Sequence, residues 1–360
     1  MRVHVLHEPT YTRNVEVLLF PLIFNRKRLR ERGIELAFFK RIVPLLFECD
    51  VLCVSSKFFS RWWIERGADS VPQFLQQARR KGAERVLWFD MGDGTGASQF
   101  EVLPYIDRYV KGQLLRPLTN YQKNYYGMRI FTDLIHEKFG IEDGHPDELH
   151  LRKVPTDEEL KKLTVGWSWG MMNYGRFGEV WGKISFRSSL LPRFVPRHWY
   201  EPSADRPVLI SCRIGTRYTR PTVAFPRLEI KRRLEGKVPS DFISRREFFK
   251  ELTQSLGAIT PFGYGEVCYR DYEIVLAGAT MIKQDMSHLE TWPHIWRGEE
   301  TYVPFKWDLS DFDEKLEYAR NHRGEMADRA RAAQVIYKRA LVSEEGHQEF
   351  CDRFMRIISA

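Results

Sequence analysis

The sequence has little cysteine and no long apolar segment. Its cysteines are odd in number and include no Cys-x-x-Cys pair: Cys49, Cys53, Cys212, Cys268 and Cys351. This argues against a disulfide framework or a zinc ribbon and favours a reducing cytoplasm. The longest apolar run, residues 17–24, is less than half of the roughly 20 residues that span a bilayer. Any membrane contact is therefore expected to be peripheral, and we expect no signal peptide.

Common nucleotide and hydrolase motifs are also missing, since no P-loop, His-Glu-x-x-His, Gly-x-Ser-x-Gly or kinase set occurs. The 360 residues, 43% hydrophobic and 29% charged, are typical of a globular protein of two or three domains. The net charge of +8 is the difference between 56 basic and 48 acidic residues. Such a balance suits an enzyme with an anionic substrate, or a surface that meets acidic lipid, and is weak evidence for nucleic acid.

Short apolar runs alternate with amphipathic stretches in two parts of the chain, which predicts parallel sheets built from strand–helix–strand units. We expect strands at 3–6, 50–54, 85–90, 109–111, 208–211, 257–261 and 279–282. We expect helices at 25–40, 71–81, 226–235, 244–256 and over most of 311–356. The region 141–207 is rich in Pro, Gly, His and Trp, and we interpret it as connecting and cleft-lining rather than as sheet.

The predicted fold class is therefore α/β, with two Rossmann-like domains that face a central cleft and a helical C-terminal tail. The predicted boundaries are 1–200 for the first domain, 201–335 for the second and 336–360 for the tail, which could pack back on the first domain. Open parallel sheets bind ligands at the carboxyl ends of their strands, so the cleft is the expected site.

The most informative segment covers residues 260–282. A loop with Gly263 and Gly265 lets backbone approach a ligand closely, and a helix is expected to begin near Glu266 and end at Gly278. Backbone N–H groups at the start of that helix can bind a phosphate, and the guanidinium of Arg270 can donate two parallel hydrogen bonds to phosphate oxygens. Glu273, on the same face, can accept from sugar hydroxyls. The alternative is a set of ordinary ion pairs within the helix.

This segment resembles the donor-binding strand–loop–helix of glycosyltransferases with the two-domain GT-B architecture, and is closest to exostosin-like members. The resemblance covers about 25 residues and is carried by Pro261, Gly263 with Gly265, Arg270, Glu273, Ala277-Gly278 and 280–282. It implies that Arg270 and Glu273 contact a nucleotide-sugar donor, with Tyr264 and Glu266 in the same loop. Many retaining members carry two glutamates eight positions apart, whereas Glu266 and Glu273 are seven apart. We therefore infer no stereochemical outcome.

Further basic residues follow the strand at 208–211, namely Arg213, Arg217, Arg220 and Arg227. In a GT-B protein this is the first strand and loop of the donor domain. Arg213 and Arg217, nearest the strand end, are the candidates for neutralising a donor pyrophosphate. The alternative is a solvated basic face. His288 follows the strand after the donor helix and is a further donor-site candidate, although a lone histidine is more often structural.

On the acceptor side, the run 90–96 (Asp-Met-Gly-Asp-Gly-Thr-Gly) follows a predicted strand. Asp90 or Asp93 could act as the general base or bind an acceptor hydroxyl; the alternative is a turn without chemistry. The run is neither Gly-x-Gly-x-x-Gly nor Asp-x-Asp. That speaks against the metal-dependent one-domain transferases, so no metal and no cofactor beyond the donor is expected.

The segment 26–32 is strongly basic and could rest on anionic lipid, or be an ordinary charged helix face. The pairs Trp62-Trp63 and Trp167/Trp169 could stack on sugars or pack in the core. The resemblance implies a glycosyltransferase that acts on a saccharide or lipid-linked saccharide in surface polysaccharide or glycan assembly. We expect it in the cytoplasm, either free or at the inner face of the membrane. The alternatives are a non-catalytic module that binds an anionic polymer such as nucleic acid, and another nucleotide-sugar enzyme such as an epimerase.

Overall fold

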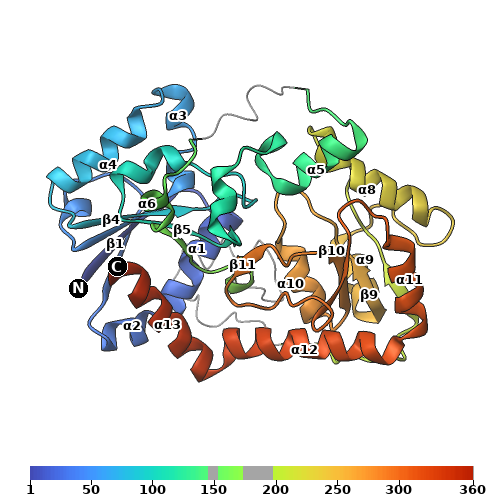
Figure 1. Ribbon diagram of the computed structural model, residues 1–360. Helices are drawn as coiled ribbons and strands as arrows, with labels where there is room; N and C mark the ends of the chain where they lie inside the picture. Colours follow the sequence, from blue (N-terminus) through green and yellow to red (C-terminus); the bar gives the residue numbers. More distant parts are fainter. Residues whose placement is uncertain (145–152, 173–197, 360) are drawn as a thin grey trace.

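Two parallel β-sheets organise the chain, each built from successive strand–helix units (Figure 1). The structure, a computed structural model, describes residues 1–144, 153–172 and 198–359. The first sheet has six strands in the order β2-β1-β3-β4-β5-β7, and every neighbouring pair is parallel. Its strands are β1 (Arg2–Leu6), β2 (Glu35–Phe39), β3 (Val51–Ser55), β4 (Arg85–Asp90), β5 (Arg108–Lys111) and β7 (Leu163–Val165).

The central strands of this sheet are mostly apolar because helices cover both faces. All five residues of β3 are buried. The helices of this domain are α1 (Arg13–Phe24), α2 (Arg26–Glu31), α3 (Trp62–Glu65), α4 (Ser70–Arg80), α5 (Ile130–Phe139) and α6 (Asp157–Leu160). Helix α1 begins where the side chain of Thr12 accepts a hydrogen bond from the amide of Val15 (3.2 Å).

The second sheet has four parallel strands in the order β12-β10-β9-β8. They are β8 (Val208–Ser211), β9 (Ser255–Ile259), β10 (Thr280–Gln284) and β12 (Tyr302–Phe305). Three helices connect them: α8 (Pro221–Leu234), α9 (Arg245–Gln254) and α10 (Tyr269–Leu276). A capping box is present at the start of α9, where Ser244 and Glu247 exchange two hydrogen bonds (3.2 and 2.9 Å).

Two features tie the domains together. A short antiparallel pair joins β6 (Gln113–Leu115) of the first half to β11 (Leu289–Thr291) of the second. The C-terminal helices α11 (Phe312–Asn321) and α12 (Arg323–Val342) pack on the second domain, and α13 (Glu344–Ser359) returns to the first (Figure 1). There Phe350 of α13 lies 5.2 Å from Trp167, measured between ring centroids.

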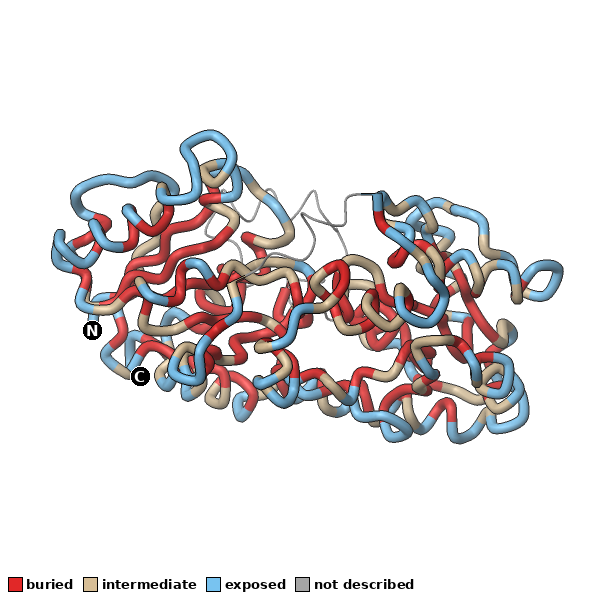
Figure 2. Tube along the Cα trace, turned by 45° about the horizontal axis from the view of Figure 1, so that its top comes forward, coloured by how far each residue is buried: buried red, intermediate tan, exposed pale blue. Residues whose placement is uncertain are grey.

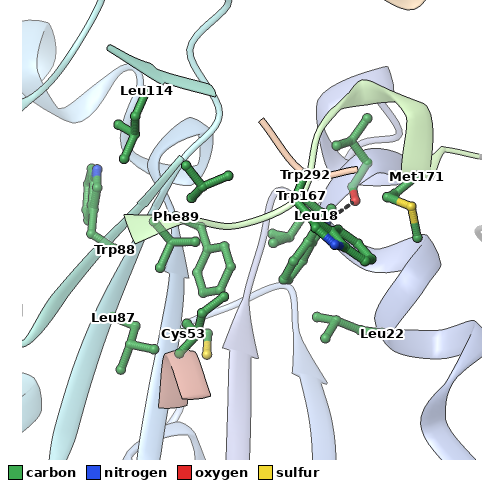
Figure 3. Packing of buried hydrophobic residues seen from close by; sticks show 14 of the residues in the cluster. Leu18, Leu22, Cys53, Leu87, Trp88, Phe89, Leu114, Trp167, Met171 and Trp292 are labelled. Carbon is green, nitrogen blue, oxygen red and sulfur yellow. Dashed lines mark hydrogen bonds between the residues drawn. The ribbon is translucent and has the colours of Figure 1, made fainter. Parts of the chain in front are cut away.

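The buried apolar residues form one continuous cluster across both domains and a smaller one inside the second domain (Figure 2). Trp167 is central to the larger cluster, since its ring lies 5.4 Å from that of Phe89 and its indole N–H donates to the carbonyl of Val17 (2.7 Å). Figure 3 shows the indole beside Leu18 of α1 and Trp292. The two domains are therefore held together mainly by packed apolar surface.

The predicted fold class is confirmed: the protein is α/β, with two Rossmann-like domains and a helical C-terminal tail. Three local predictions were wrong. The expected helix over 25–40 ends at Glu31, because Gly33 takes a left-handed φ of 78° and the following residues pair with β1 as strand β2. Part of 141–207 is sheet, since β7 pairs with β5. Residues 145–152 and 173–197 of that region lie outside the described residues.

The third correction concerns the donor segment, where α10 begins at Tyr269 rather than near Glu266. Asp271 at the third position accepts from the amide of Cys268 (2.8 Å), and this contact sets the helix start. The predicted end is confirmed, because Gly278 has a φ of 69° directly after the helix.

Candidate functional site

The carboxyl edges of the two sheets face each other, and loops from both edges meet there. The amide and hydroxyl of Thr95, after β4, donate to the carboxylate of Glu266, after β9 (2.9 and 2.5 Å). Gln113 bridges the same loops, donating to the carbonyl of Asp93 (2.6 Å) and accepting from the amide of Val267 (3.2 Å). In open parallel sheets this edge is where ligands bind, so the structure places the candidate site between the domains.

The loop glycines serve contact between the two domains. A Cβ on Gly265 would lie 2.1 Å from the carbonyl oxygen of Asp93, and one on Gly94 would lie 2.6 Å from that of Tyr264. A Cβ on Gly263 would lie 2.8 Å from the hydroxyl of Tyr218. The predicted close approach at Gly263 and Gly265 therefore exists, but its partner here is protein backbone or side chain rather than a ligand.

Tyr264 and Glu266 take part in the same inter-domain contact. The carbonyl of Tyr264 accepts from the guanidinium of Arg129 (2.7 Å), and its hydroxyl bonds to Thr219 (2.7 Å). Glu266 is buried, and among the described residues its carboxylate receives hydrogen bonds only from Thr95 and Gln113 of the first domain. Glu266 thus holds the domains together, and its place outside α10 removes it from the predicted phosphate-binding turn.

Arg270 and Glu273 lie together on α10, and neither points into bulk water. The guanidinium of Arg270 sits over the ring of Phe248 on α9 (5.2 Å) and donates to the carbonyl of Arg213 (2.5 Å). The carboxylate of Glu273 is buried and pairs with Arg245, the first residue of α9 (3.2 Å). Burial raises the pKa of Glu273, and the positive charges of Arg245, Arg270 and Arg13 oppose that rise.

Arg13 brings the first domain to this cluster. It is the first residue of α1, and its guanidinium lies 4.0 Å from the ring centroid of Tyr269 on α10. Tyr269 and Glu273 are one turn apart and therefore share a face of the helix. Three arginines and one carboxylate from three helices thus gather where α1 meets α10. We call this set the cleft cluster: Arg13, Arg245, Arg270 and Glu273.

The other predicted arginines have different surroundings. The guanidinium of Arg213 is held by both carboxylate oxygens of Glu251, so it is not available as predicted. Arg227 is buried and donates to the carbonyls of Pro261, Phe262 and Gly215, which shapes the loop after β9. Arg217 is exposed and forms no ion pair with a described residue. It remains the candidate of this group for an anionic ligand.

Asp90 does not have the surroundings of a base. Its carboxylate is buried, pairs with Lys111, and accepts from the hydroxyl of Tyr109 (2.7 Å) and the amide of Gly92 (2.8 Å). Because donors already surround it, we assign Asp90 to holding the loop after β4. Asp93 differs, since it is exposed and its carboxylate forms no hydrogen bond with a described residue.

His288 packs between aromatic rings instead of facing the cleft cluster. Its ring centroid lies 4.7 Å from that of Trp307 and 6.3 Å from that of Phe262. Burial lowers its pKa, and the nearby Glu266 charge opposes this. Its buried Nδ1 has no hydrogen-bond partner among the described residues, and its donor-binding role stays a prediction.

Glu8 is a site candidate that the sequence analysis did not single out. It follows β1 at the same carboxyl edge, its Oε2 accepts from the hydroxyl of Ser55 (2.7 Å), and its buried Oε1 has no hydrogen-bond partner in the described part of the chain. Burial raises the pKa of Glu8, opposed by a hydrogen bond from its own backbone, by the Ser55 hydrogen bond and by Lys57. Its position directly after a predicted strand was the available signal. No signal in the sequence pointed to Arg13 or Arg245, because only the packing of α1 and α9 on α10 brings these two residues together.

A narrow pocket lies beside this region, at the carboxyl ends of β4, β5 and β7. Its walls are mostly apolar and include Trp167, Trp169, Phe89, Met91 and Val267. Trp167 is therefore both a core residue and a wall of this pocket. Trp62, by contrast, packs in the core against Phe59 and Phe74.

Two further observations concern metals and membranes. Among the described residues, no group of three or more His, Cys, Asp or Glu side chains is arranged to hold a metal ion. No helix in the described part of the chain is both long enough and apolar enough to cross a membrane. In the predicted lipid-binding segment 26–32, Arg28 pairs with Glu344 and Arg32 with Asp352 (2.5 Å for the latter), so much of its charge anchors α13.

Comparisons with known proteins give similarity of fold at very low identity. No protein-family model matches the chain, and no curated protein matches it. It is similar to the crystal structure of TarM (6% identity, 86% of this chain and 55% of that one, TM-score 0.40), so it spans about half of TarM. It is also similar to a DNA-modifying β-glucosyltransferase (12%, 100% of both chains, TM-score 0.43) and to a glycosyltransferase from Rickettsia africae ESF-5 (9%, 99% and 98%, TM-score 0.47). We take no residue role from these similarities.

Proposed function

We propose that the protein is a glycosyltransferase that moves a sugar from a nucleotide-sugar donor to a saccharide or lipid-linked saccharide acceptor, in surface polysaccharide or glycan assembly. The observation that carries the proposal is the cleft cluster. Arg270 and Glu273 lie on one helix at the carboxyl edge of the second sheet, and Arg13 reaches them from the first domain. A guanidinium can bind a diphosphate through parallel hydrogen bonds, and a neighbouring carboxylate can accept from sugar hydroxyls.

In this proposal, Arg270 and Arg13 bind the donor diphosphate and stabilise the charge that develops on it as the sugar leaves. Glu273 accepts from the hydroxyls of the donor, and exposed Arg217 adds a further positive charge. The ion pair with Arg245 supports this role, because it fixes the orientation of the buried Glu273 carboxylate.

On the acceptor side, Asp93 is the exposed carboxylate for binding an acceptor hydroxyl. Transfer with inversion of configuration requires a base, and Glu8 is the carboxylate best suited to it. Its raised pKa makes it a stronger base than an ordinary carboxylate, and its Oε1 accepts no hydrogen bond from a described residue. Replacement of Glu8 by Gln then lowers kcat strongly while donor affinity changes little, which steady-state kinetics and calorimetry separate.

Donor binding tests the proposal directly. We expect nucleoside diphosphates or their sugars, at about 100 times the dissociation constant, to stabilise the protein by about 2.7 kcal/mol in thermal shift. Arg270→Gln should weaken that binding at least about tenfold, since it removes a charged hydrogen bond. Arg246→Gln is the matched control, because Arg246 is a neighbouring exposed arginine of α9 outside the cleft cluster. Equal nucleotide affinity in both variants would contradict the proposal.

Products distinguish transfer from epimerisation. Incubation with one nucleotide-sugar and no acceptor should leave the sugar configuration unchanged, with slow hydrolysis at most. Conversion of the donor into its epimer would instead establish the other nucleotide-sugar chemistry. The absence of any nucleotide effect, together with salt-sensitive binding of an anionic polymer, would favour a binding module.

A further inference from the structure

Four aliphatic side chains of the first domain are exposed together with basic residues. Ile64 is 86% exposed, Leu45 is 55% exposed, and Val43 and Ile42 are 37% and 36% exposed. They lie after β2 and after β3, beside the basic residues Lys40, Arg41, Lys57, Arg61 and Arg66. We call these nine residues the apolar–basic surface. Single exposed apolar residues are ordinary, but a group of them with one sign of charge indicates an interaction surface.

Shared packing brings the two segments of this surface together. The 3-10 helix η1 (Pro44–Phe47) places Phe47 6.1 Å from Phe74 of α4, measured between ring centroids. Trp62 of α3 lies 6.1 Å from the same ring. Both segments are thus anchored on α4 by aromatic residues, the buried Phe47 and the partly buried Trp62, while their neighbours Leu45 and Ile64 are exposed. Figure 1 shows α3 beside α4 at one end of the first domain.

The charge of this surface is strongly one-sided. Residues 40–45 and 57–69 contain the five basic residues but only two acidic ones, Glu65 and Asp69. Within the described parts of the chain, Arg41, Lys57 and Arg61 form no ion pair. Arg66 stacks on the ring of Trp62 (3.9 Å). Positive charge here is therefore available to an external partner, unlike that of Arg28 and Arg32, which is paired with α13.

We propose that the apolar–basic surface docks on an anionic lipid bilayer. Basic residues near an anionic leaflet are attracted to its headgroups, and aliphatic side chains that leave water gain hydrophobic free energy. The charge pattern matches lipid headgroups, and the projecting aliphatic side chains match the acyl boundary beneath them. The inference does not depend on the proposed reaction. Its consequence for that reaction is that the acceptor edge of the first sheet lies near the membrane.

Vesicle co-sedimentation of the full chain tests this docking. We expect binding to phosphatidylcholine vesicles that contain phosphatidylglycerol, weaker binding to phosphatidylcholine alone, and loss of binding at high salt. Two double variants test the apolar and the basic residues of the surface separately: Leu45→Glu with Ile64→Glu, and Arg41→Glu with Arg61→Glu. Each pair should weaken binding by about tenfold or more. All four side chains are exposed, so unchanged thermal midpoints should confirm that these variants fold.

The matched control is Lys27→Glu with Arg30→Glu on α2. It makes the same change of charge on exposed residues of the same domain, but the apolar neighbour Leu29 is buried. We expect the control to bind as the wild type does. No binding of the wild type to anionic vesicles, or equal loss in the control and in Arg41→Glu with Arg61→Glu, would overturn the proposal. So would a dimer in light scattering that Leu45→Glu with Ile64→Glu converts to monomer, because the surface would then bind a second copy.

Discussion

At the scale of single residues, His7 and Glu8 are adjacent buried groups that both favour their uncharged forms. Burial and, to a smaller extent, the charge of Lys40 lower the pKa of His7 to about 4, while its hydrogen bond to the carbonyl of Glu8 opposes them. Burial raises the pKa of Glu8. Both residues lie at the edge of the sheet where the acceptor is proposed to bind, so acidification affects stability and the candidate base together.

The depressed pKa of His7 predicts loss of stability in acid. A base with a lowered pKa in the folded state contributes stability above its unfolded pKa of 6.5, and this is lost as the pH falls towards about 4. The free energy of unfolding should fall by about 3 kcal/mol through His7. Glu8 partly offsets this fall, because its raised pKa acts in the opposite direction. Denaturant unfolding at several pH values should show a smaller acid loss in His7→Asn. His198→Asn, at an exposed site, should behave as the wild type.

The buried pair of Asp90 and Lys111 should be sensitive to removal of one partner. Lys111→Met leaves the Asp90 carboxylate buried without its counter-charge, which should destabilise the protein by about 3–5 kcal/mol. Adding Asp90→Asn removes the stranded charge and keeps an acceptor for Tyr109, so the double variant should recover much of the loss. Thermal unfolding of the two variants measures this coupling, and equal stability of both would contradict the assigned structural role.

At the scale of elements, the loops after β4 and β9 meet through glycines. Gly265→Ala would place a methyl group 2.1 Å from the carbonyl oxygen of Asp93, so one loop must move. We expect a loss of about 1–3 kcal/mol in unfolding free energy. Gly215→Ala is the matched control, because nothing lies within 4 Å of its added Cβ, and its effect should stay within about 0.5 kcal/mol. Equal effects would show that the loops do not meet in this way.

At the scale of the whole molecule, α13 crosses back to the first domain and covers its apolar surface. Phe350 and Phe354 pack against Trp167, and Arg28 and Arg32 pair with α13 from α2. A chain ending at Val342 should therefore aggregate or unfold at a lower temperature, as light scattering and calorimetry would show. Arg32→Gln should change stability by about 1 kcal/mol or less, because partly exposed ion pairs contribute little. An unchanged midpoint in the shortened chain would contradict this role.

Local signals in the sequence determined much of the architecture. Apolar runs predicted the central strands, the helix expected at 244–256 is present as α9, and Gly278 predicted the end of α10. These features depend on neighbours a few residues away, so spacing alone reveals them. The edge strands β2 and β7 were missed because short segments at the edge of a sheet become strands only when β1 and β5 are there to pair with them.

The roles of charged groups in the site were decided by tertiary structure. Asp90, Arg213 and Glu266 looked available in the sequence, but their partners Lys111, Glu251 and Thr95 lie 21, 38 and 171 positions away. Arg13, Arg245 and Glu8 gained their candidate roles in the same way, through packing of distant elements. The type of a residue determines what its side chain is able to bind. The fold determines which partner it binds, because a buried charged group can pair only with the donors and acceptors that the folded chain places beside it.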